Sequence, residues 1–182
     1  MMSPPLVVSA GEYFTLEAFQ NSGGNLDAEQ DENTFFGIME SFATQRVLLA
    51  LSSDQTIGTS LVHVDWEAET YDEGGFWDVG APSRITIPGG VSLVRFFAGL
   101  RFEAGVASSH MFCNIDKNGG SFIGGGALEP EAMATTSTTR LAIASAPVAV
   151  VEGDYFEVQT RGSTSIDILA DPQSYFGMEV LL

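Results

Sequence analysis

The chain of 182 residues is short of cysteine, of basic residues and of long apolar runs. Its single cysteine, Cys113, cannot form an internal disulfide, so covalent cross-links do not stabilise the fold. No stretch approaches the roughly 20 consecutive apolar residues that a membrane helix needs, and the first residues lack the positive flank of a secretory signal. We therefore expect a soluble protein, made in a cytosol, that does not insert into a membrane.

Basic residues number seven against 24 acidic ones, which gives a formal net charge of −17. Such a chain repels phosphate groups, so we expect no nucleic-acid partner. The imbalance is greatest in residues 1–45, which hold seven carboxylates and no Lys or Arg before Arg46. We interpret residues 1–45 as an acidic arm that attaches to a partner surface, and residues 46–182 as one folded domain.

Motifs that would supply catalysis or hold a cofactor are also scarce. The two histidines, His63 and His110, and the one cysteine lack the spacing of zinc motifs. The glycine cluster "GGSFIGGG" lacks the Gly-Lys-Ser/Thr ending of a phosphate loop, and no Gly-x-Ser-x-Gly elbow occurs. His63 is predicted to lie on the solvent-facing side of a strand. We expect no catalytic site, no metal ion and no cofactor, and hence no enzyme.

The sequence is rich in alternating apolar and polar residues, which indicate β-strands. "LVHVDWEAET" is predicted to form one half-buried strand, with Val62, Val64, Trp66 and Ala68 on the inner face. "VSLVRFFAGLRFE" repeats the pattern, but Leu93 and Phe97 fall on its charged face, which suggests contact with a partner subunit. The inner face of this second strand would consist of Val94, Phe96, Ala98, Leu100 and Phe102.

Turn signals separate these runs. Asn118-Gly119 predicts a tight hairpin, and Pro147 and Gly153-Asp154 separate further apolar runs. From residue 46 onward, eight to ten short strands recur at the spacing of an antiparallel sandwich. Only the segment before them indicates a helix, because Phe35, Ile38, Met39 and Phe42 fall at helical spacing. A strand beginning at Thr34 is the competing interpretation.

The stretch "YDEGGFWD" places Asp72, Glu73 and Asp78 around two glycines and two aromatic residues. A calcium loop of the EF-hand kind needs carboxylates at alternate positions followed by a distant glutamate, which this stretch lacks. A glycosidase pair would need a second carboxylate across a cleft, which a sequence cannot show. We favour a third interpretation, in which residues 72–75 form a turn and Phe76 and Trp77 cover one end of the sandwich.

Six motifs occur in the order typical of one family: "YDEGGFW", "ITIPGG", "VSLVRFFAGLRF", "DKNGG", "VAVVEGDYFEVQTRG" and "YFGMEVLL". Over residues 46–182 the chain therefore resembles the globular-head domain shared by the first complement component and tumour necrosis factor. In particular it is similar to the versions of that domain in virion proteins of tailed bacteriophages. The resemblance implies a ten-strand jelly roll that assembles as a homotrimer. We assign Leu93, Phe97, Tyr155 and Tyr175 to the trimer interface.

The resemblance, together with a chain too short for the long stalk of a receptor-binding fibre, favours a capsid decoration, or cement, protein that stabilises the phage head. Its partners would be two further copies of itself and the major capsid protein or other virion proteins, and its location the virion, assembled in the host cytoplasm. A tail or fibre-tip protein that recognises a host-surface glycan or protein is the alternative, and a carbohydrate-active jelly-roll enzyme comes third. The attachment residues in the arm would be Tyr13, Phe14, Phe19, Phe35, Phe36, Ile38, Met39 and Phe42.

Overall fold

The computed structural model describes residues 45–103, 111–122 and 138–181 of the chain. These residues form thirteen β-strands and no helix, which confirms the all-β prediction. In the same ranges there is no helix that is long and apolar enough to cross a membrane. Residues 1–44, which hold the predicted arm and its possible helix, lie outside the described part of the chain.

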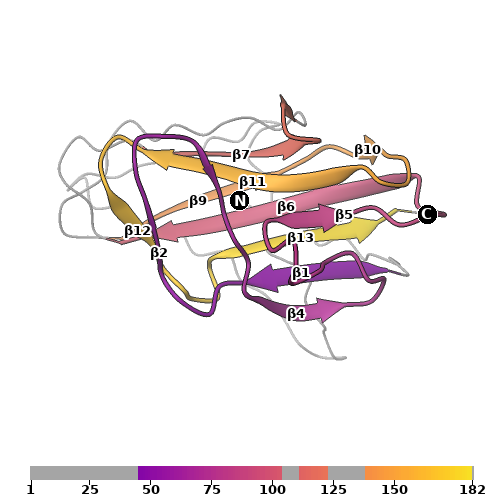
Figure 1. Cartoon of the computed structure of the whole chain (residues 1–182), viewed down its shortest axis with the longest axis horizontal. Helices are drawn as coiled ribbons and strands as arrows, with labels where there is room; N and C mark the ends of the chain where they lie inside the picture. The colour runs from indigo at the N-terminus through magenta and orange to yellow at the C-terminus, as the bar shows by residue number, and fades with distance from the viewer. Residues whose placement is uncertain (1–44, 104–110, 123–137, 182) are drawn as a thin grey trace, which may run out of the picture. The chain divides into compact units, whose positions relative to one another are not determined.

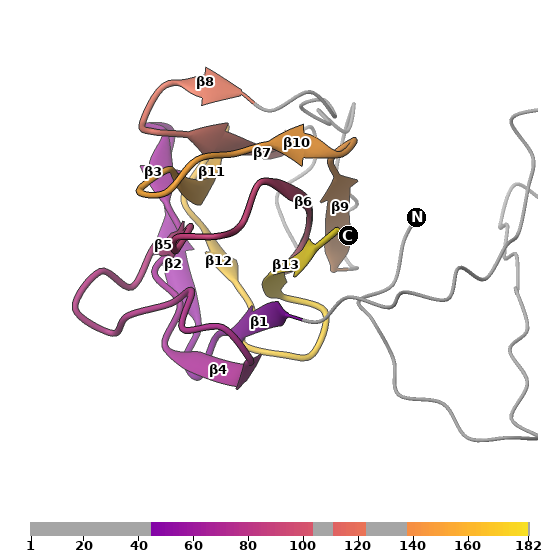
Figure 2. The same ribbon diagram turned by 90° about the vertical axis from the view of Figure 1, so that its right-hand side faces the viewer.

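Two antiparallel sheets, named sheet A and sheet B here, pack face to face (Figures 1 and 2). Sheet A has eight strands and sheet B has five. In sheet A the order is β2-β12-β6-β13-β1-β4, and β9 and β10 pair with the other edge of β6. The strands of sheet A are β1 (Arg46–Ala50), β2 (Gln55–Ile57), β4 (Ala68–Asp72), β6 (Leu93–Phe102), β9 (Thr139–Ala144), β10 (Val148–Ala149), β12 (Ile166–Ile168) and β13 (Tyr175–Val180).

Sheet B is built around β11, which pairs with β3, β5 and β7, while β8 pairs with β7. Asn118 and Gly119, between β7 and β8, both have positive φ angles, of 55° and 75°. The predicted Asn-Gly hairpin is therefore confirmed. The strands of sheet B are β3 (Val62–His63), β5 (Arg84–Thr86), β7 (Met111–Lys117), β8 (Ser121–Phe122) and β11 (Tyr155–Gly162).

The number of strands exceeds the predicted eight to ten, because six of the thirteen are only two or three residues long. The prediction of a single strand over "LVHVDWEAET" is wrong, because the chain leaves one sheet and enters the other within this stretch. The Val64 amide donates to the Val158 carbonyl in sheet B, whereas the Glu67 amide donates to the Ala50 carbonyl in sheet A. The chain thus crosses from one sheet to the other, and buried Val64 and Trp66 fill the space between them.

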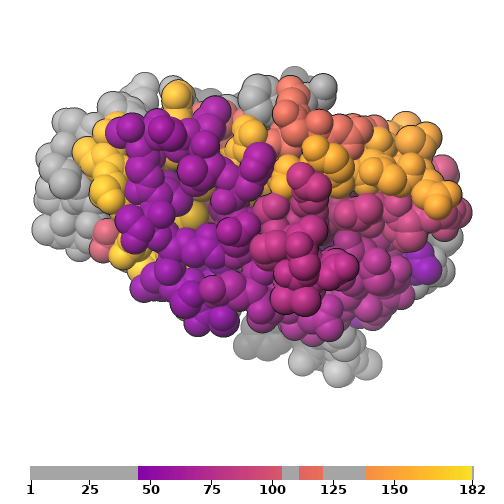
Figure 3. All heavy atoms as spheres, viewed as in Figure 1, coloured from indigo at the N-terminus to yellow at the C-terminus, as the bar shows by residue number. Residues whose placement is uncertain are grey.

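Aromatic rings hold the two sheets together. Phe96 of sheet A lies with its ring centroid 4.1 Å from that of Phe156 in sheet B and 6.0 Å from that of Phe176. All three side chains are fully buried, and each contributes about 1.5–3 kcal/mol to stability through loss of apolar surface. The predicted inner face of β6 is confirmed, because Val94, Phe96, Ala98, Leu100 and Phe102 are all 0% exposed. In the space-filling view, atoms from the first half of the described chain, indigo to magenta, spread over much of the visible face (Figure 3).

Candidate functional site

The face of sheet A that points away from the core, called the outer face of sheet A below, carries an ordered pattern of side chains. Strand register places residues in rows across β1, β13, β6 and β9. The two central rows contain only small, aliphatic or aromatic residues. The first row is Leu48, Gly177, Phe97 and Ala144, and the second is Ala50, Tyr175, Gly99 and Ala142.

Two glycines in these rows make room for two aromatic rings. A Cβ atom on Gly177 would lie 2.2 Å from Cε2 of Phe97, and a Cβ atom on Gly99 would lie 2.8 Å from Cε1 of Tyr175. The rings therefore lie against bare backbone, with centroids 6.3 Å apart. Phe97 is 5% exposed and Tyr175 is 3% exposed. The two rings form a buried apolar floor, around which Leu48, Ala142 and Ala144 are half-buried.

Charged residues border this floor at both ends. At one end Arg46, Glu179 and Arg95 form a row in register, in which Arg95 and Glu179 form an ion pair. At the other end Arg101 pairs with Asp171, and Nη2 of Arg140 donates to the Tyr175 hydroxyl at 2.9 Å. Burial raises the pKa of Tyr175, and the neighbouring Arg140 offsets part of this effect. The phenol is therefore neutral at physiological pH.

The structure brings together three of the four residues assigned to a trimer interface. Leu93, Phe97 and Tyr175 all lie on the outer face of sheet A. Tyr155 does not, because it begins β11 in sheet B, where the Arg84 guanidinium lies 4.1 Å from its ring centroid. Tyr155 and Tyr175 occupy similar places, each at the start of a late strand, and the sequence does not show to which sheet a strand belongs. The eight predicted attachment residues of the arm lie outside the described residues.

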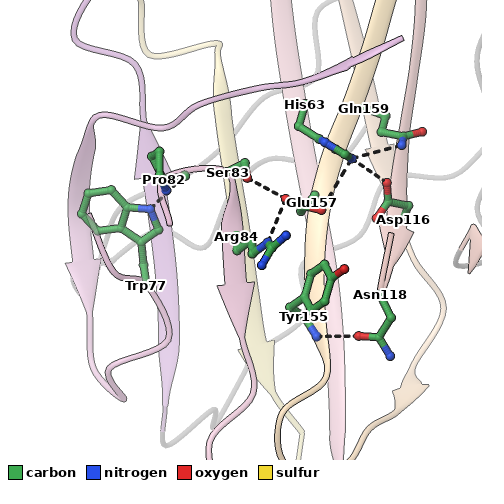
Figure 4. Close-up of polar contacts among 10 residues, drawn as sticks. All are labelled: His63, Trp77, Pro82, Ser83, Arg84, Asp116, Asn118, Tyr155, Glu157 and Gln159. Atoms are coloured by element: carbon green, nitrogen blue, oxygen red, sulfur yellow. Dashed lines mark hydrogen bonds and ion pairs between the residues drawn. The ribbon is translucent and has the colours of Figure 1, made fainter. Parts of the chain in front are cut away.

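The stretch "YDEGGFWD" forms a turn, as we predicted. The Asp72 carboxylate accepts hydrogen bonds from the backbone amides of Gly74, Phe76 and Trp77 at 3.0–3.2 Å. Phe76 is buried in the core, and the indole of Trp77 donates to the Pro82 carbonyl (Figure 4). The other two carboxylates have separate partners, Arg46 for Glu73 and the Gly80 amide for Asp78.

A second group of functional side chains lies on the outer face of sheet B and was missed in the sequence. His63, which we expected to point to solvent, is 36% exposed at its side chain and faces two buried carboxylates. Its Nε2 atom lies 3.0 Å from Oδ2 of Asp116 and 3.5 Å from Oε2 of Glu157 (Figure 4). The three residues come from β3, β7 and β11. The available signal was the alternation of polar with apolar residues in "CNID" and "YFEVQT", but the register that joins them is not visible in a sequence.

Cys113 is fully buried on the core side of β7. Burial raises the pKa of its thiol to about 12. A thiol with so high a pKa is not a nucleophile at neutral pH, so Cys113 belongs to the core and not to a site.

No family model matches this sequence. No curated protein matches it either. Solved structures do match the fold: crystal structures of murine APRIL at pH 5.0, pH 8.5 and pH 8.0 are similar to it with TM-scores of 0.54, 0.52 and 0.52. The identities are 11%, 10% and 11%, and each match covers 75% of this chain and 98% of the APRIL chain.

The fold is a jelly roll of the tumour necrosis factor type. This confirms the predicted architecture. At 10–11% identity the likeness concerns the fold alone, and function has to be argued from the surface of this chain.

Proposed function

We propose that this protein is a non-enzymatic structural protein that assembles as a homotrimer through the outer face of sheet A. The observation that carries the proposal is the pair of central rows on that face, with the Phe97 and Tyr175 rings lying on glycines between two charged borders. An apolar centre with a polar border is the composition of a protein–protein interface, and the half-buried Leu48, Ala142 and Ala144 carry the area that a partner would cover. The outer face of sheet B is rich in polar side chains and lacks such a centre among its described residues.

The proposed trimer serves as a capsid decoration protein on the head of a tailed bacteriophage. Support comes from the resemblance of residues 46–182 to phage virion domains and from the acidic, aromatic-rich composition of residues 1–45. In this proposal the arms bind the major capsid protein or other virion proteins. Three linked arms bind far more tightly than one, because the second and third contacts form at a high effective concentration.

The association face is tested with Ala144→Glu, which places a carboxylate beside Phe97 in a central row at a position that is only half-buried. Val79→Glu is the matched control, because Val79 is 75% exposed and lies on a loop. We expect light scattering to give a monomer for Ala144→Glu and a trimer for Val79→Glu, with unchanged circular dichroism in both. A folded Ala144→Glu variant that remains trimeric would exclude this face.

The virion role is tested by deleting residues 2–44. We expect the truncated chain to remain a soluble trimer and to lose its attachment to phage particles, since the arm would carry the contacts. Normal attachment of the truncated chain would refute the arm's role. A reconstruction of the particle that places this chain on the tail, or strong selective binding on a glycan array, would favour the receptor-binding alternative.

A further inference from the structure

The polar group on the outer face of sheet B joins three strands that are distant in sequence. His63 of β3, Asp116 of β7 and Glu157 of β11 each direct one potential ligand atom to a common point, and these atoms all lie within 4.8 Å of one another. Register fixes the arrangement, because Glu157 lies opposite Asp116 and Gln159 lies opposite His63. Figure 4 shows the four side chains converging.

The Nε2 atom of His63 lies near more hydrogen-bond acceptors than one N–H group can donate to. Nε2 of His63 has two acceptors, carboxylate oxygens of Asp116 at 3.0 Å and of Glu157 at 3.5 Å, while the nitrogen of the Gln159 amide, a donor, lies 3.1 Å away. A single N–H group satisfies one of these partners. A rotation of the Gln159 amide by 180° would present its oxygen instead of its nitrogen, which would make three oxygen ligands around one imidazole nitrogen.

The carboxylates are buried and only partly neutralised. The side chains of Asp116 and Glu157 are 0% and 3% exposed. Oε1 of Glu157 accepts from the Ser83 hydroxyl at 2.6 Å and from Nε of Arg84 at 3.1 Å. The Arg84 guanidinium thus pairs with Glu157, whereas the only polar contact of the Asp116 carboxylate among the described residues is with His63. A buried charge without a compensating partner costs several kcal/mol by the usual order of magnitude, so this arrangement favours a bound cation.

A second, independent observation lies beside the cluster. Oδ1 of Asp116 is buried and has no hydrogen-bond partner, and neither does the side-chain oxygen or nitrogen of Asn114, which is 4% exposed. Asn114 is two residues before Asp116 on β7 and lies opposite Gln159. It therefore shares the outer face with the cluster. Buried polar atoms in native proteins nearly always have a partner. The unpartnered atoms of Asp116 and Asn114 therefore indicate that a ligand binds beside them.

We propose that His63, Asp116 and Glu157 bind a divalent transition-metal ion of the Zn²⁺ type. Zinc bonds to imidazole nitrogen and carboxylate oxygen are about 2.0–2.2 Å long, which puts neighbouring tetrahedral ligand atoms about 3.4 Å apart. The separations of 3.0 Å and 3.5 Å from Nε2 of His63 are near this spacing, and the two carboxylate oxygens lie within 4.8 Å of each other. The imidazole ligand favours zinc, cobalt or nickel over magnesium and calcium, which prefer oxygen alone. The Gln159 amide oxygen or a water molecule supplies the fourth ligand.

The ion would act as a cross-link within the fold. β3 is only two residues long, and its register with β11 consists of His63 with Gln159 and Val62 with Thr160. A metal bond from His63 to residues on β7 and β11 would tie this short strand to the two longest strands of sheet B. Since the ion binds the folded chain and not the unfolded one, it would raise the stability with the logarithm of its concentration over the dissociation constant.

The experiment titrates the full chain, freed of metal by a chelator, with Zn²⁺ and separately with Co²⁺. We expect calorimetry to give one strongly bound ion per chain, Co²⁺ to produce a visible absorption band of a tetrahedral or five-coordinate site, and Zn²⁺ to raise the melting temperature. Light scattering should give the same mass with and without metal. A chain that does not bind Zn²⁺ could therefore still form the proposed trimer, and a chain that stays monomeric could still bind Zn²⁺.

Substitutions assign the ligands. His63→Ala removes a partly exposed ligand, and we expect it to weaken Zn²⁺ binding by at least about tenfold and to abolish the shift in melting temperature. Asp116→Asn keeps the shape of the buried side chain and should have the same effect. Glu152→Gln, at an exposed carboxylate between β10 and β11, is the control and should bind Zn²⁺ like the wild type. Absence of a tight one-to-one complex in the wild type, or tight binding that persists in His63→Ala, would overturn the proposal, with a proton on His63 then bridging the carboxylates.

Discussion

The ring of Phe97 on β6 lies against the backbone of Gly177 on the neighbouring strand β13, so closely that a Cβ atom on Gly177 would fall 2.2 Å from Cε2 of the ring. The same atom would lie 3.0 Å from the Val47 carbonyl oxygen. Side-chain packing on the outer face of sheet A thus depends on a residue without a side chain.

Gly177→Ala should therefore destabilise the protein. The Phe97 ring would have to leave its position, and overpacking of this kind costs about 1–3 kcal/mol. Urea denaturation at one fixed protein concentration measures the effect. Gly58→Ala is the control, because nothing lies within 4 Å of a Cβ atom there, and we expect it to change the stability by less than about 1 kcal/mol. Equal effects of the two substitutions would show that the close packing at Gly177 does not matter.

Asp72→Ala should destabilise the fold more than Asp78→Ala. Asp72 accepts three backbone hydrogen bonds, whereas the Asp78 carboxylate accepts one, from the exposed Gly80. Each donor left without a partner costs about 1–3 kcal/mol when buried and less near solvent. We expect a loss of about 2–3 kcal/mol for Asp72→Ala in thermal or urea unfolding, and no effect of calcium on the wild type. Stabilisation by calcium that disappears in Asp72→Ala would instead support a calcium loop.

Cys113 should resist alkylation in the folded protein. Its thiol is fully buried and its pKa is raised to about 12, so almost no thiolate exists at pH 8. We expect iodoacetamide to modify the single cysteine within minutes in 6 M guanidinium and at least about a hundredfold more slowly without it. Mass spectrometry gives both rates. Fast labelling of the folded chain would show that this part of β7 is open to solvent.

Stability should fall as Asp154 is protonated. Burial raises the pKa of Asp154, but hydrogen bonds from Lys117, Asn118 and the Val151 amide outweigh it and lower the pKa from 3.8 to about 2. A group with a lowered folded-state pKa stabilises the fold above its unfolded value and loses that contribution as the pH drops through the folded value. Asp154→Asn should thus be less stable than the wild type at pH 7.

The difference between wild type and Asp154→Asn should shrink as the pH falls from about 4 to about 2. Urea midpoints measured across this range test the expectation, with Glu152→Gln as the control at an exposed neighbour. A difference that stays constant with pH would mean that the Asp154 charge is not what stabilises the turn between β10 and β11.

Much of the fold was predictable because it depends on local patterns. The alternation in β6 identified its buried face, and Asn118-Gly119 identified a hairpin. Asn118 also makes two long-range hydrogen bonds that no local pattern predicts. Its side-chain amide accepts from the Tyr155 backbone and donates to Asp154. The turn at Asp72 was predictable from glycines and carboxylates in one short stretch.

The sites were harder to predict, because they depend on which strands are neighbours. Tyr155 and Tyr175 read alike in the sequence but lie in different sheets. His63 reads as a solvent-facing residue, and only the pairing of β3 and β7 with β11 brings it to Asp116 and Glu157. Strand pairing over such distances is set by the packing of the whole sandwich, which short-range periodicity does not encode.

The outer face of sheet A as an assembly surface is the central claim, and the mass of the full chain in solution tests it most directly. Sedimentation equilibrium should give three times the chain mass of 19.4 kDa, with one chain per particle for Ala144→Glu. A wild-type chain that sediments as a monomer throughout the micromolar range would contradict the account.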